Sequence, residues 1–218
     1  PNSFMIAICG GRNVKFMTTL MLLLPALGAG FALQQPDTSF VTFIMLAALS
    51  GVGGGAFASS MSNISFFYPK KMQGLALGLN AGLGNAGVSV MQFLIPYIIT
   101  FSAFGAIGGE PYQVGDSQLW IQNAALVWVP ILAVFMVMAF LLMNNLPQHK
   151  CGSTVSAVGK YLWLSLLGFI GGGLAVFLLR SDWGGFPELA KIFVILIIAV
   201  LVTLFLMKKA TPAETKEK

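Results

Sequence analysis

The sequence predicts an all-α integral membrane protein, a partial helical bundle, and two observations lead to this fold class. First, the 218 residues are 57% hydrophobic and only 9% charged, whereas soluble domains carry about 25% charged residues. Second, six long segments hold no charged residue, and a helix of roughly 20 apolar residues crosses the bilayer core. The six segments are Phe16–Gln34, Val41–Tyr68, Leu75–Ala103, Ala124–Asn144, Tyr161–Leu179 and Ile192–Met207.

The two ends of the chain differ from these spans. Asn2–Cys9 is apolar but too short to cross a bilayer, and we interpret it as the end of a helix cut by the start of the chain. Pro1 is not preceded by the basic region or cleavage site of a secretory signal, which favours a fragment or a trimmed chain. Lys208–Lys218 is polar and charged, and we expect it to be a solvated tail or linker.

The loops on the two sides of the membrane differ in charge. When the sides alternate at each span, ten of the twelve basic residues fall on one side and five of the seven acidic residues fall on the other. The positive-inside rule makes the basic side cytoplasmic. Because the basic residues are spread over several loops and not gathered on one face, the lipid bilayer is an expected partner and nucleic acid is not.

Short polar turns separate the spans. Gly10–Asn13 is expected to form a tight cytoplasmic turn, because glycine readily adopts positive φ angles. Pro36–Ser39 forms a short outer turn, and Pro69 ends the span before it because proline cannot continue helical hydrogen bonding. Phe104–Asn123 is expected to be the longest outer loop.

One stripe on the third span begins with small residues and becomes polar toward its middle, within roughly an 80° arc of a helix. The stripe consists of Gly78, Gly82, Asn85, Ser89 and Gln92. Small residues let a neighbouring helix approach closely, and a side-chain amide needs protein or water because lipid offers it no partner. Two interpretations stay open for Asn85 and Gln92: hydrogen bonds between helices, or the lining of a cavity for a small polar substrate.

Asn80 lies off this stripe, on the face of Gly84 and Gly87. In the preceding span, Ser59 and Asn63 share a face at positions i and i+4, and Phe57 lies elsewhere. A lone aromatic residue in a membrane helix usually packs against its neighbours. These residues are therefore packing or lining candidates from the pattern alone.

Several kinds of site are not indicated by the sequence. Cys9 and Cys151 have neither the number for a disulfide framework nor the spacing of metal ligands, and His149 stands alone in a polar loop. The six apolar segments hold no ionisable residue, so they offer neither a proton relay nor a cation for an anion site. Without a nucleophile–base pair or a complete phosphate-binding loop, we expect no enzyme, no cofactor and no metal.

The blocks Ala58–Lys70 and Ala76–Asn85, the second continuing through Gly87–Gln92, resemble the nitrate/nitrite porter family of the major facilitator superfamily. The second block looks like the nitrate signature on the fifth helix of that family. The resemblance runs from about Pro1 to Asn144 and implies a major-facilitator-type helical bundle, from the end of helix 2 through helix 6. Gly10–Lys15 would then be the loop between helices 2 and 3.

The resemblance implies a domain order and a function. Residues 1–144 would be part of an amino-terminal six-helix transporter half, 145–160 a cytoplasmic loop, 161–207 two additional transmembrane helices, and 208–218 a cytoplasmic tail or linker. Family members are secondary transporters that import or exchange nitrate and nitrite across the cytoplasmic (inner) membrane. Their two halves rock around a midplane site, and the carboxy-terminal half would be missing from this chain.

The resemblance also implies roles for single residues. Asn85 would hydrogen-bond the anion, Phe57 would flank it, and the glycines of the fifth helix would let that helix slide or bend. Of the two arginines that pair with the anion in the family, one falls just before Pro1 and the other belongs to the missing half. A transporter of another small anion or solute, and a non-transporting helical membrane module, are the alternative interpretations.

Overall fold

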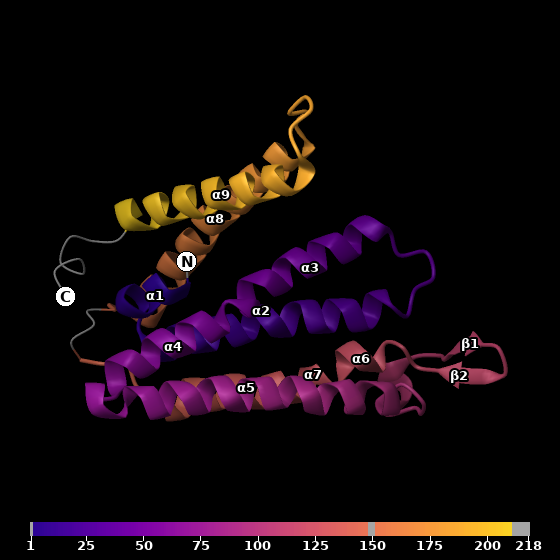
Figure 1. Cartoon of the computed structure of the whole chain (residues 1–218). Helices are drawn as coiled ribbons and strands as arrows, with labels where there is room; N and C mark the ends of the chain where they lie inside the picture. Colours follow the sequence, from indigo (N-terminus) through magenta and orange to yellow (C-terminus); the bar gives the residue numbers. More distant parts are fainter. Residues whose placement is uncertain (1, 148–150, 211–218) are drawn as a thin grey trace. The chain divides into compact units, whose positions relative to one another are not determined.

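The computed structural model describes residues 2–147 and 151–210, and most of them are helical (Figure 1). The chain forms two compact units, Pro1–Val14 with Asn145–Lys218 and Lys15–Asn144, and each is described by itself. The expected polar loop around His149 and residues 211–218 of the expected tail lie outside the described residues.

The first unit consists of α1 (Asn2–Cys9), α8 (Thr154–Arg180) and α9 (Glu188–Ala210). The α1 helix packs against α8, and α8 lies beside α9 as a helical hairpin (Figure 1). Gly171 of α8 is buried, and a Cβ atom there would overlap the Thr203 hydroxyl of α9. Such a small residue lets two membrane helices approach closely. At the turn, Lys191 Nζ donates to the Ser181 carbonyl at 2.8 Å and satisfies a carbonyl at the end of α8.

The second unit holds most of α2 (Gly11–Ala32), α3 (Phe40–Gly54), α4 (Ala56–Phe67), α5 (Lys70–Ile98), α6 (Asn123–Leu126) and α7 (Trp128–Leu142). The α3 helix begins at an N-cap, because the Ser39 hydroxyl accepts a hydrogen bond from the Thr42 N–H at 3.4 Å. The α4 helix ends where Pro69 keeps Tyr68 extended, with φ −102° and ψ 138°. The next helix, α5, packs against α4.

The connection between α5 and α6, where we expected the longest outer loop at residues 104–123, contains secondary structure of its own. It contains the 3-10 helix η1 (Gly105–Gly108) and the antiparallel strands β1 (Tyr112–Val114) and β2 (Ser117–Leu119). The fully buried Gln122 donates through Nε2 to the carbonyls of Gly108 at 2.6 Å and Glu110 at 3.0 Å. The Tyr112 hydroxyl donates to the Leu33 carbonyl just after α2, so the hairpin is attached to the carboxy-terminal end of that helix.

A second buried amide attaches the same region to α5. Asn123 Nδ2 donates to the carbonyls of Ile98 at 3.1 Å and Phe101 at 2.9 Å. The α5 helix therefore ends at Ile98 and not at residue 103 as expected, because the chain turns there to meet α6.

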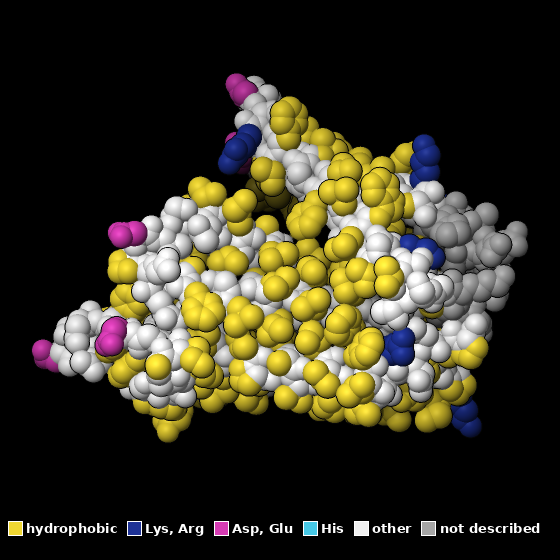
Figure 2. Space-filling view, turned by 180° about the vertical axis from the view of Figure 1, so that it is seen from behind, with side chains coloured by type: hydrophobic (Ala, Val, Ile, Leu, Met, Phe, Trp, Pro, Cys, Tyr) yellow, Lys and Arg dark blue, Asp and Glu magenta, His cyan; other side chains and the backbone are white. Residues whose placement is uncertain are grey.

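Five helices in the described residues are long and apolar enough to cross a membrane. They are Gly11–Ala32, Phe40–Phe67, Asn123–Leu142, Thr154–Arg180 and Glu188–Ala210. The α5 helix has 29 residues but is richer in glycine and amide side chains, so its membrane crossing stays a prediction. Hydrophobic side chains cover much of the face in Figure 2, and many large ones are exposed, as expected for surfaces that lipid covers. The chain is therefore a multi-pass membrane protein, and the expected all-α membrane fold is confirmed.

The turn between α1 and α2 is tighter than expected. Gly10 alone makes it, with φ +85°, and α2 already begins at Gly11. Lys15 consequently lies within the membrane-length helix α2. The predicted apolar segment Phe16–Gln34 itself holds no ionisable residue, and Lys15 belongs to the part of α2 that extends beyond it.

Candidate functional site

The polar stripe predicted on α5 lies on an exposed face of the helix. Asn85, Ser89 and Gln92 are all exposed, and their side chains have no hydrogen-bond partner among residues 2–147 and 151–210. An amide facing lipid without a partner costs free energy. This face of α5 therefore needs protein, water or a polar ligand against it.

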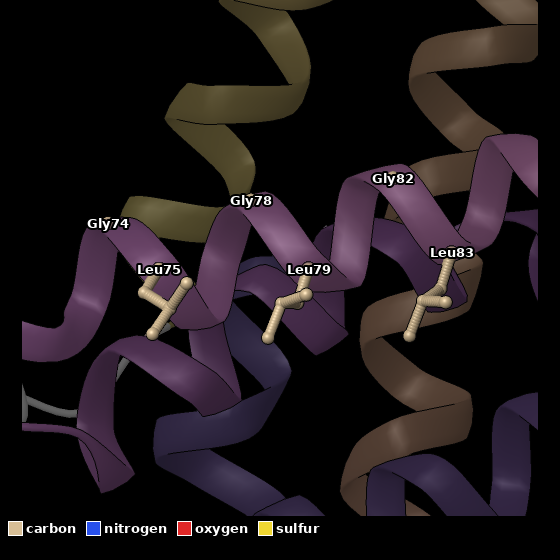
Figure 3. Close-up of a pocket in the computed structure, with 6 residues that line it drawn as sticks. All are labelled: Gly74, Leu75, Gly78, Leu79, Gly82 and Leu83. Carbon is tan, nitrogen blue, oxygen red and sulfur yellow. The ribbon is translucent and has the colours of Figure 1, made fainter.

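A shallow groove of ≈380 Å³ runs along the amino-terminal half of α5 (Figure 3). It is lined by Gly74, Leu75, Gly78, Leu79, Gly82 and Leu83. A Cβ atom added at Gly78, Gly82, Gly84 or Gly87 would meet nothing within 4 Å, so none of the described residues occupies the space beside these glycines. Their expected roles in helix packing or sliding stay predictions.

Asn80 contacts the neighbouring helix. It is half-buried, and its Nδ2 donates to Met61 Sδ of α4 at 3.3 Å. A thioether is a weak acceptor, so this contact contributes little beyond packing. The structure thus separates the two asparagines of α5: Asn80 lies against α4, and Asn85 is exposed.

The α4 helix directs its three candidate residues to different surroundings. Ser59 is fully buried, and its hydroxyl donates to the Ala56 carbonyl of the same helix at 2.9 Å. Asn63 is half-buried, and its Oδ1 accepts no hydrogen bond from the described part of the chain. Phe57 is 53% exposed, so Phe57 and not Ser59 is available to a ligand.

The two residues predicted to bind substrate lie on helices that pack against each other. Phe57 is on α4 and Asn85 is on α5, and both side chains are exposed. Within the described residues, neither side chain has a hydrogen bond or ring contact. The arrangement provides one aromatic surface and one amide that are both free to meet a small polar ligand.

Lys15 is a candidate that our sequence reasoning missed. Its Nζ donates to the Ala56 carbonyl at 2.8 Å and to the Ser60 hydroxyl. Both acceptors lie in the first turn of α4, on either side of Phe57 in the chain. The available signal was a basic residue directly beside an apolar span, which we assigned to a loop.

The two cysteines lie in the first unit, and both are buried. Burial raises the pKa of the Cys151 thiol above its ordinary value, although the nearby Lys160 and Arg12 charges act in the opposite direction. In the described ranges, no three His, Cys, Asp or Glu residues are grouped so that they could hold a metal ion.

Comparison with known proteins identifies relatives for part of the chain, although no family model matches it. Nitrate/nitrite transporter NarU from Salmonella typhimurium is 45% identical over 169 residues, which cover 75% of this chain and 36% of that protein. Nitrate/nitrite transporter NarU from Escherichia coli K12 is 47% identical over 152 residues, covering 69% and 33%. "Probable nitrate/nitrite antiporter NarK2" from Thermus thermophilus is 43% identical over 150 residues, covering 66% and 34%. The chain spans about a third of the length of these relatives.

Proposed function

The part of the chain that aligns with these relatives belongs to the nitrate/nitrite porter family, and from this we propose that the protein transports nitrate and nitrite across the cytoplasmic membrane. The proposal concerns the complete gene product that contains the chain, because the chain spans about a third of its relatives. Relatives named as a transporter and an antiporter support a transporter and not an enzyme. The proposed function includes the exchange of nitrate for nitrite, by alternating access of one site to the two sides of the membrane.

The observation that carries the proposal is the exposed amide of Asn85 on α5. Each oxygen of nitrate can accept hydrogen bonds, and an asparagine amide supplies two N–H donors. Asn85 has no hydrogen-bond partner in the part of the chain that the structure describes, so its donors are available. Hydrogen bonds to a charged partner are stronger than those between neutral groups, which suits Asn85 to an anion.

Phe57 supplies the second surface that we assign to the anion. Its ring is exposed on α4, the helix that packs against α5. A flat ring can exclude water from one side of a flat ion. The ring and the amide together would distinguish a planar oxyanion from a bulky or apolar solute.

The described residues of α4 include no arginine or lysine, and the lysines of α5, Lys70 and Lys71, lie at its first turn, about four turns from Asn85. A planar oxyanion is bound best by the two-pronged hydrogen bonding of guanidinium groups. The resemblance to the family implies two such arginines, and neither is among the described residues of α4 and α5. We therefore propose that this chain alone binds nitrate weakly and that the complete gene product binds it well.

Counterflow in proteoliposomes tests the proposal. Vesicles that hold the complete gene product are loaded with nitrite, and the uptake of labelled nitrate is followed with the chain alone as a second sample. Exchange by the complete product and not by the chain supports the proposal. A folded, inserted product that exchanges nothing contradicts it, and equal competition by chloride would favour a transporter of another small anion.

A further inference from the structure

The span formed by α3 and α4 is interrupted directly before Phe57. The α3 helix ends at Gly54, Gly55 stands between the helices with φ −65° and ψ −2°, and α4 begins at Ala56. Glycine loses more conformational freedom in a helix than any other residue. The direction of α4 at this point therefore depends on contacts from outside the span.

The α2 helix contacts the span on both sides of this interruption. Before it, Gly53 is buried against α2, and a Cβ atom there would overlap the Leu22 side chain. After it, Lys15 Nζ donates to the Ala56 carbonyl at 2.8 Å and to the Ser60 hydroxyl. Lys15 and Leu22 are about two turns apart on α2, so two separate points of one helix hold the two sides of the interruption.

The ammonium group of Lys15 is directed to α4 and not to the neighbouring apolar groove. An ammonium has three N–H donors, and two of them are used by the first turn of α4. The side chain lines a groove of ≈360 Å³ with Thr19 and with apolar residues of α7 that include Phe135 and Met138. These apolar side chains offer the ammonium no acceptor, so its contacts to α4 are the favourable ones.

The Ala56 carbonyl receives two side-chain donors. Besides Lys15, the fully buried Ser59 donates to it at 2.9 Å. Side-chain hydrogen bonds to a helix carbonyl compete with the helix ladder and bend the helix. Phe57 follows Ala56 directly, so the residue that carries the exposed ring belongs to the turn that Lys15 contacts.

We infer that Lys15 is a positioning residue for Phe57: it fixes the first turn of α4 and thereby the direction of the aromatic ring. The consequence for nitrate rests on the proposed function, whereas the attachment of α4 to α2 does not. If Lys15 served only general packing, its replacement would lower the stability of the protein without a specific effect at residue 57. This difference can be measured.

The first experiment measures the position of residue 57 without any substrate. Phe57→Cys is introduced into the complete gene product lacking native cysteines, and its rate of labelling by a water-soluble maleimide is followed. Lys15→Met should change this rate about threefold or more, because the turn is released. Lys15→Arg should restore it, since a guanidinium also donates to a carbonyl and a hydroxyl. Thr19→Val, which removes a hydroxyl one turn along α2, should leave it unchanged.

A reporter at Val41 completes this experiment. Val41 is exposed on α3, in the same span but far along the chain from the interruption. Val41→Cys should be labelled at the same rate with and without Lys15→Met. An unchanged rate at residue 57, or an equal change at both positions, would overturn the inference.

The second experiment uses nitrate counterflow. Lys15→Met should raise the KM for nitrate about tenfold, as expected for a misplaced contact to the substrate, and the amount of inserted protein should stay the same. In a Phe57→Ala background, Lys15→Met should have no further effect on KM, because two residues that act through one contact are not additive. Additive effects in the two backgrounds would overturn the inference. If the unmodified product exchanges no nitrate, the proposed function fails, and the labelling experiment still decides the role of Lys15.

Discussion

Replacing Asn85 by alanine should weaken nitrate transport and leave the fold intact. The side chain is exposed and has no hydrogen-bond partner in the described residues, so its removal leaves no buried group unsatisfied. A hydrogen bond to a charged partner contributes about 1.5–3 kcal/mol, and about 1.4 kcal/mol corresponds to a tenfold change in affinity. In nitrite-driven counterflow, the KM for nitrate should therefore rise about 10- to 100-fold.

Asn80→Ala is the matched control for this prediction. Asn80 is the same residue type on the same helix, but its amide contacts Met61 of α4. Its replacement should change the KM by no more than about twofold, because a thioether is a weak acceptor. Asn85→Asp should abolish nitrate uptake, since a carboxylate repels an anion. Unchanged uptake by the Asn85→Ala variant, at equal insertion, would refute the reasoning, as would an equal loss in the Asn80→Ala variant.

Three further predictions concern stability of the complete gene product, measured by thermal or denaturant unfolding in detergent. Gln122→Leu should lower the free energy of unfolding by about 2–3 kcal/mol, because the buried carbonyl of Gly108 and the part-buried one of Glu110 lose their donor. Gln118→Leu on the exposed strand β2 should have little effect, and equal losses in the two variants would contradict this prediction. Gly171→Leu should lower the free energy of unfolding by about 1–3 kcal/mol, because the larger side chain overpacks against α9. Gly172→Leu should leave the free energy of unfolding unchanged, because the space beside Gly172 is open. A Gly171→Leu variant of unchanged stability would argue against the close approach of the two helices. Because burial raises the pKa of Cys151 above 9.0, its contribution to stability is present at neutral pH and is lost as the pH rises past that value. Cys151→Ser should therefore reduce the alkaline loss of stability, and identical pH profiles would refute this.

The spans could be predicted from sequence because hydropathy and length decide whether a helix can cross a membrane. Their ends could not, since they depend on single residues. Gly10 makes the first turn alone, so α2 starts at Gly11. In contrast to this local effect, α5 ends at Ile98, whose carbonyl accepts a hydrogen bond from the buried amide of Asn123. This contact joins residues that are 25 positions apart in the chain.

The candidate site was predictable to a similar degree. Helical periodicity separated Asn80 from Asn85, and the structure places one against α4 and the other on an exposed face. The role of Lys15 could not be read from the sequence, because it depends on α2 lying beside a turn 41 residues away. Its contacts follow from tertiary packing, which no local pattern contains.

The β1–β2 hairpin offers a place to measure motion in this protein. Gln122 holds the connection together internally. Tyr112 joins the hairpin to the Leu33 carbonyl just after α2, and Asn123 joins the same region to the end of α5. A probe placed at the tip, near Gly115, would therefore follow the carboxy-terminal ends of α2 and α5 and not an independent loop. Fluorescence from that tip would report a tilt of these two helices.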